Sequence, residues 1–98
     1  MTRIRRSSGN VFKDLGFPAR EAAHLLIRSD LMIQLTKTLK ERRLTQVRAA
    51  RLLGVSQPRV SDLVRGRIDL FSIDTLVEML ARLGVSVSLR IRRSKRVA

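Results

Sequence analysis

The sequence predicts an all-α domain that ends in a single β-strand, and three observations lead to this class. The chain has 98 residues, which suits one small domain. Aliphatic residues recur at helical spacing, and glycines and N-capping residues divide that pattern into segments. Near the C-terminus the pattern changes to an alternation of apolar and polar residues, which is typical of a strand with one buried face. Because only 3% of the residues are aromatic, the core is expected to be aliphatic.

The first helix is expected from Pro18 to about Arg43. Pro18 suits the first turn of a helix, and no glycine or further proline interrupts the stretch. The sequence leaves open whether residues 18–43 form one helix or two, because Ser29 could cap a new helix. Residues 1–10, "MTRIRRSSGN", are rich in Arg, Ser and Gly and are predicted to be a flexible basic N-terminus.

Three shorter helices are expected next, and each has a capping residue before it and a glycine after it. The second of them carries Pro58 in its first turn and runs to about Arg65. Their N-caps are Thr45, Ser56 and Ser72, and the glycines that end them are Gly54, Gly66 and Gly84.

The predicted strand covers residues 85–91, "VSVSLRI", and its buried face consists of Val85, Val87, Leu89 and Ile91. An isolated strand is not stable in water, so this one needs a partner. The N-terminal segment is one candidate, but a second copy of the chain is the simpler solution. We therefore expect a two-fold dimer joined through antiparallel copies of this strand. The predicted domain spans residues 11–92, and residues 93–98 form a basic tail.

The residues around "GVSQPRVS", residues 54–61, have the spacing of a helix-turn-helix motif. A small residue at Ala50 lets two helices approach closely, and Gly54 makes the sharp turn between them. Val60 and Leu63 are three residues apart, so they share one face of the second helix and pack it against the first. The positions that fit the pattern are Gln46, Ala50, Gly54, Val60 and Leu63.

The second helix of this motif has a polar face suited to the major groove of DNA. On a helical wheel Val60, Leu63 and Val64 lie on one side, and polar residues and Pro58 occupy the other. The opposite face consists of Pro58, Ser61, Asp62 and Arg65, with Arg59 at its border and Gln57 at the exposed N-terminal end.

Each of these side chains has a chemistry that matches part of a base pair or a phosphate. Gln57 can bond an adenine edge, and Arg59 or Arg65 a guanine edge or a phosphate. Asp62 repels phosphates, so its carboxylate is expected to accept a hydrogen bond from a cytosine amino group. Pro58 offers only apolar contact, for instance with a thymine methyl group.

The stretch "LTQVRAARLLGVSQPRVSDLVRG" resembles the Cro and phage-repressor (Xre-like) helix-turn-helix family. The resemblance implies a phage-repressor-like bundle in which the second helix of the motif contacts bases and the N-terminus of the first holds a phosphate. It implies phosphate contacts for Thr45 and Gln46, and backbone contacts for Arg65 and Arg67. The candidate base-reading residues are Gln57, Pro58, Arg59, Ser61 and Asp62, and the candidate phosphate-binding residues are Thr45, Gln46, Ser56, Arg65 and Arg67.

A narrower resemblance extends over most of the chain. "GNVFKDLGFP" before the motif and "RGRIDLFSIDTLVEMLARLG" after it look like the HigA-like antitoxin group of Xre regulators. This resemblance implies a dimeric, autorepressing antitoxin that binds a two-fold operator in double-stranded DNA and a small ribonuclease toxin of the HigB or RelE kind. Such toxins are usually basic, and so is this chain, so the contact would have to be apolar or use its few acids, such as Asp14 and Glu21. The alternative is a stand-alone Xre-type repressor without a toxin partner.

The net charge of +13 supports a polyanionic partner. Between residues 40 and 67 eight Lys and Arg accompany two acids, so the positive charge is concentrated around the motif. About half of these cations are expected to contact phosphates.

The remaining composition argues against other classes of protein. The chain has no cysteine and His24 is its only histidine, so no disulfide, metal site or cofactor is predicted. No grouping of nucleophiles, bases and acids indicates an enzyme. No apolar run approaches the ~20 residues of a membrane span, so the expected location is the cytoplasm and no membrane contact is predicted.

Overall fold

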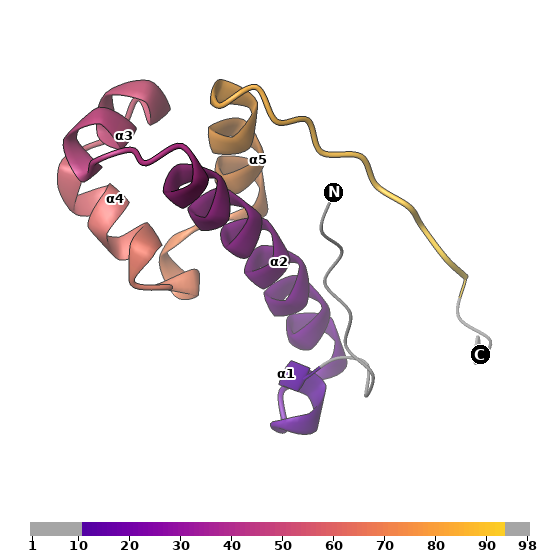
Figure 1. Ribbon diagram of the computed structural model, residues 1–98. Coiled ribbons are helices and arrows are strands. Elements are labelled where there is room, and N and C mark those ends of the chain that lie inside the picture. The colour runs from indigo at the N-terminus through magenta and orange to yellow at the C-terminus, as the bar shows by residue number, and fades with distance from the viewer. Residues whose placement is uncertain (1–10, 94–98) are drawn as a thin grey trace.

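The computed structural model describes residues 11–93, which contain five α-helices and one short 3-10 helix. Figure 1 shows α3, α4 and α5 around the C-terminal part of α2, and α1 at the opposite end of that helix. The predicted N-terminal segment 1–10 and residues 94–98 of the predicted tail lie outside the described residues. In chain order the elements are α1 (Val11–Asp14), α2 (Ala19–Glu41), α3 (Gln46–Leu53), α4 (Gln57–Val64), η1 (Ile68–Leu70) and α5 (Ile73–Arg82).

The long helix α2 is continuous over 23 residues. Ser29 therefore lies inside the helix and caps no second one. The helix ends where the chain turns at Arg43, whose φ of 53° is in the left-handed region. The amide of Leu44 donates to the carbonyl of Leu39 at 3.1 Å, which satisfies one of the last carbonyls of α2.

The short helix α1 has no clear periodicity in the sequence and was not predicted. Gly16, with a φ of 95°, turns the chain after it. The rings of Phe12 and Phe17 then meet edge to face, with centroids 6.1 Å apart. At the same end of α2, Ala22 is fully buried outside the main core.

All three predicted N-caps are confirmed. The hydroxyl oxygens of Thr45, Ser56 and Ser72 each accept a hydrogen bond from the backbone amide three residues later, at 3.2, 3.4 and 3.1 Å. These bonds satisfy amides that have no partner within the helix. The boundaries of α3, α4 and α5 are therefore set by short-range signals.

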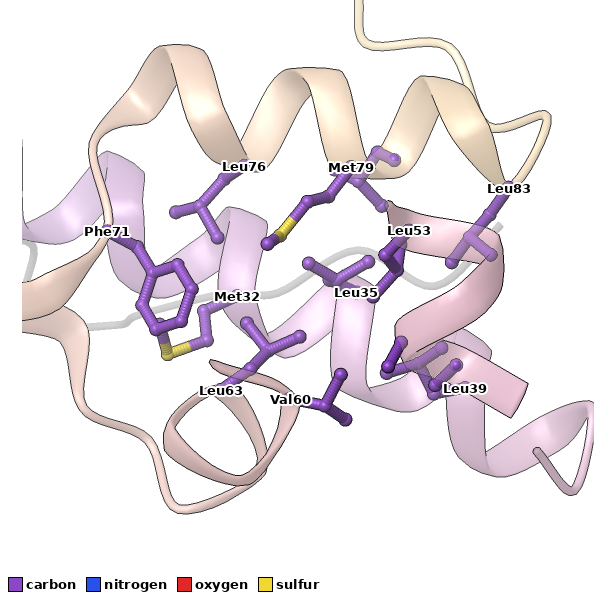
Figure 2. Close-up of a cluster of buried hydrophobic side chains, with 13 residues drawn as sticks. Met32, Leu35, Leu39, Leu53, Val60, Leu63, Phe71, Leu76, Met79 and Leu83 are labelled. Carbon is purple, nitrogen blue, oxygen red and sulfur yellow. The ribbon is translucent and has the colours of Figure 1, made fainter. Parts of the chain in front are cut away.

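The core is aliphatic, as expected, with Phe71 as its only buried aromatic side chain among residues 11–93 (Figure 2). It joins the C-terminal part of α2 to the three helices that follow. Its members are Met32, Leu35, Leu39, Ala49, Ala50, Leu53, Val60, Leu63, Phe71, Leu76, Met79, Leu80 and Leu83. The predicted all-α bundle is confirmed.

The predicted C-terminal strand does not form in the single chain. Residues 85–91 have no regular secondary structure, and Figure 1 shows this segment running away from the end of α5 without a neighbouring strand. Val85 and Val87 pack against the core, whereas Leu89 and Ile91 are 79% and 91% exposed. The physical reason is that the hydrogen bonds of a strand require a second backbone, which one copy of the chain does not supply.

Candidate nucleic-acid interface

The helices α3 and α4 are joined by a tight turn that fixes their relative orientation. Gly54 ends α3 with a φ of 70°, and the amide of Val55 donates to the carbonyl of Ala50 at 3.0 Å. Ala50 is 9% exposed, so its small side chain lies between packed elements as the motif requires. A Cβ atom at Gly54 would lie 3.0 Å from a guanidinium nitrogen of Arg82 and would have the same positive φ. The side chain of Arg82 is flexible and can move aside, so the positive φ is the reason that glycine is favoured here.

The inner side of α4 is held by Val60 and Leu63, which are 1% and 0% exposed. The helical wheel placed Val64 on the same side, but the structure leaves it 54% exposed. It lines an open apolar groove between α2 and α4 together with Ile33. Two buried residues, rather than three, therefore anchor α4 in the core.

The outer side of α4 presents four of the five candidate base-reading residues. Gln57 and Pro58 are exposed, and Ser61 and Asp62 are partly exposed. Gln57, Pro58 and Ser61 line a shallow surface hollow with Gln46, the first residue of α3. The fold thus brings a candidate phosphate contact on one helix next to candidate base contacts on the other.

The candidate phosphate-binding residues Thr45, Gln46, Ser56, Arg65 and Arg67 are all exposed. Thr45 stands at the N-terminus of α3, where its hydroxyl oxygen accepts from the amide of Arg48. The proton of that hydroxyl can still be donated to a phosphate, beside the positive end of the helix dipole. Arg67 follows α4 and pairs with Asp69 at 3.7 Å, an exposed ion pair that a phosphate can replace.

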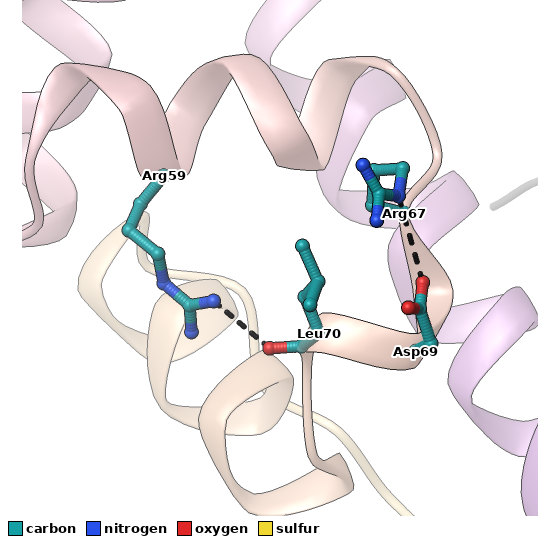
Figure 3. A network of polar contacts seen from close by, with 4 residues as sticks. All are labelled: Arg59, Arg67, Asp69 and Leu70. Carbon is teal, nitrogen blue, oxygen red and sulfur yellow. Dashed lines mark hydrogen bonds and ion pairs between the residues drawn. The ribbon is translucent and has the colours of Figure 1, made fainter.

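The fifth candidate base-reading residue, Arg59, is placed differently from the other four. Its Nη1 donates to the carbonyl oxygen of Leu70 at 2.8 Å, and Figure 3 shows the side chain extending from α4 toward that carbonyl. Its Cζ lies 4.1 Å from the ring centroid of Phe71. Both contacts join residues more than ten positions apart, so no local spacing in the sequence could have indicated them.

Residues 11–93 contain no group of three or more side chains that could hold a metal ion. Over the same range, no helix has the length and apolar character needed to cross a membrane.

The capped helix pair with an exposed polar face defines a helix-turn-helix protein of the DNA-binding type. Residues 11–92 match the family described as "Helix-turn-helix domain". A solved structure named "Putative XRE Family Transcriptional Regulator" is 31% identical, with a TM-score of 0.71 over 80% of this chain and 88% of that chain. No protein of curated function matches the chain. The chain belongs to the XRE-type helix-turn-helix family of DNA-binding transcriptional regulators.

Proposed function

We propose that the chain is a repressor that binds a two-fold operator as a homodimer, through residues 56–67 of each copy. The observation that carries the proposal is the outer face of α4, where Gln57, Pro58 and Ser61 share one surface hollow with Gln46 of α3. The segment that includes this face, residues 40–67, carries eight Lys and Arg against two acids, so phosphates are attracted to it. A dimer bound at a promoter represses by excluding the polymerase.

In this proposal the residues divide into two roles. Gln57 bonds an adenine, Asp62 accepts from a cytosine amino group, and Pro58 and Ser61 contact the neighbouring base edges. The exposed residues at the rim hold the sugar–phosphate backbone and so fix the position of α4 in the groove. They are Thr45, Gln46, Ser56, Arg65 and Arg67.

The extended segment 85–91 supports the dimer. Leu89 and Ile91 are almost fully exposed, and they alternate with polar residues in the pattern of a strand. Antiparallel pairing with a second copy would supply the missing backbone hydrogen bonds and cover these two side chains.

Replacing Gln57 with alanine is expected to lower discrimination between a selected duplex and a scrambled one by about 1–3 kcal/mol, because a bidentate contact to one base is lost. Fluorescence anisotropy with both duplexes, the first selected from a random pool, measures this. Gln46→Ala is the matched control, since the same side chain is removed from a phosphate contact and both duplexes should weaken together. Equal losses on the two duplexes for Gln57→Ala would contradict its base-reading role.

Replacing Arg67 with alanine is expected to weaken all duplexes alike, because the lost contact is to a phosphate. The slope of log K against log salt concentration should become smaller by about one. A titration series at several salt concentrations measures the slope. A preserved slope, or a loss confined to the selected duplex, would show that Arg67 does not hold a phosphate.

We further propose that the protein is the antitoxin of a small ribonuclease toxin of the HigB or RelE kind. The supporting observation is apolar surface beside α1, at the N-terminal end of α2, where Leu15 is 70% and Phe17 38% exposed. Apolar contact at this end does not depend on opposite charge, which matters because the chain is itself basic.

Capture of partners with the tagged protein, after nuclease treatment, tests the antitoxin proposal. The expected result is a stoichiometric small protein that arrests growth when expressed alone and is silenced by co-expression. Leu15→Asp should lose this partner and still bind DNA, whereas Gln57→Ala should keep the partner. A dimer that binds its operator without any such partner would leave the stand-alone repressor as the function.

A further inference from the structure

We infer that Arg59 is a positioning residue, which holds the segment after α4 in place so that Arg67 meets the DNA backbone. The inference rests on the proposed function of residues 56–67. It assigns Arg59 a role inside the protein, in place of the contact with a base that the sequence suggested.

Two contacts engage the guanidinium of Arg59 at once. One N–H bonds the carbonyl oxygen of Leu70 at 2.8 Å, and Cζ lies over the ring of Phe71, 4.1 Å from its centroid. Phe71 is 1% exposed and belongs to the core, so this anchor is rigid. A guanidinium can stack and donate together because it is planar and has several N–H groups.

The bond to Leu70 also fixes Arg67, through the backbone. Gly66, with a φ of 75°, turns the chain after α4, and η1 follows directly after Arg67. The amide of Leu70 donates to the carbonyl of Arg67 at 3.0 Å. Arg59 on the first turn of α4 is thereby linked to Leu70, as Figure 3 shows, and the backbone bond links Leu70 to Arg67.

This arrangement leaves Arg59 poorly placed to contact a base. Bidentate bonding to guanine needs two N–H groups directed into the groove, whereas the guanidinium of Arg59 is held at the carbonyl of Leu70 and over the ring of the buried Phe71. The hollow that Gln57 and Ser61 share with Gln46 does not include Arg59. What Arg59 contributes to DNA binding is an ordered segment in the free protein, so that less conformational entropy is lost when Arg67 meets a phosphate.

The first part of the test needs no DNA. Hydrogen exchange of the free protein, followed by NMR, should show that Arg59→Ala lowers the protection of the Leu70 and Phe71 amides several-fold, while α5 amides such as Leu80 keep theirs. Arg59→Lys should behave like Arg59→Ala, because an ammonium group cannot stack and donate in the same geometry. Unchanged protection at Leu70 and Phe71 would overturn the inference.

The second part is a double-mutant cycle of DNA affinity with Arg67, at a temperature where all variants are folded. Arg59→Ala should weaken DNA binding, and the loss of affinity in the double variant should be smaller than the sum of the two single losses, because Arg59 acts through the phosphate contact of Arg67. The preference for each base of the selected duplex should be unchanged. Arg20→Ala, in the first turn of α2 beside α1, is the control for loss of one charge, and its effect should add to that of Arg67→Ala.

Three results would overturn the inference. If Arg59→Ala lost the preference for one particular G·C pair, Arg59 would be a base-reading residue. If the losses of DNA affinity caused by Arg59→Ala and Arg67→Ala were additive, the two residues would act independently of each other. If Arg59→Lys bound DNA as tightly as the wild type, the positive charge of Arg59 alone would account for its effect. If the wild-type protein selects no duplex, the proposed function fails instead, and the exchange experiment still reports on the Arg59 contacts.

Discussion

Replacing Leu63 with alanine is expected to destabilise the protein by about 2–5 kcal/mol, a large share of the roughly 5–15 kcal/mol of a domain of this size. Leu63 is 0% exposed and lies in the core cluster with Met32 and Phe71 (Figure 2). The loss combines the transfer of apolar surface to water with a cavity that the helices cannot fully close. Because Leu63 is one of two residues that anchor α4, DNA binding should fall with the folded fraction.

Thermal and urea unfolding measure this effect, with Val64→Ala as the matched control. Val64 follows Leu63 on the same helix but is 54% exposed, so its truncation should cost well under half as much. A loss of 3 kcal/mol corresponds to a decrease in Tm of roughly 12–24 °C for a domain of this size. Similar losses for both variants would contradict the placement of α4 on the core.

Replacing both Leu89 and Ile91 with lysine is expected to convert the proposed dimer into monomers and to weaken operator binding by at least about a hundredfold. Four apolar side chains, two from each copy, are covered in the proposed pairing, and each contributes roughly 1.5–3 kcal/mol when fully buried. Four lysines would also place like charges together. Since 1.4 kcal/mol is a factor of ten in an equilibrium constant, even part of this energy produces the stated loss.

Sedimentation velocity and operator binding measure the two consequences. The control is Ser86→Lys with Ser88→Lys, which adds the same charge to the alternate positions of the same segment. That variant should remain a dimer, because these positions face solvent in the proposed pairing. A wild-type protein that sediments as a monomer at tens of micromolar would disprove the dimer through residues 85–91.

The bounds of α3, α4 and α5 could be predicted because the signals that set them are local. Thr45, Ser56 and Ser72 each bond an amide three residues later, and Gly54 adopts a φ that other residues rarely accept. Such interactions depend on a few neighbouring residues and on no distant part of the chain.

Local signals were insufficient where two conformations have similar propensity. Ser29 could have capped a second helix, but it continues α2, and the packing of Leu35 and Leu39 in the core stabilises this helix. Residues 85–91 have the period of a strand, but pairing requires a second backbone. The period therefore did not predict the conformation of the single chain, in which Val85 and Val87 pack against the core while Leu89 and Ile91 are exposed.

In the candidate site, too, local sequence signals predicted some features, and others depended on tertiary contacts. The sequence by itself determined the helix-turn-helix, its caps and the polar character of its second helix, because each depends on spacing within about twenty residues. Only the tertiary structure decided that Val64 is exposed and that Arg59 lies against Leu70 and Phe71. A side chain at the border of a helix face has two directions open to it. Which direction it takes depends on contacts with residues that are distant in the sequence and come together only in the folded protein.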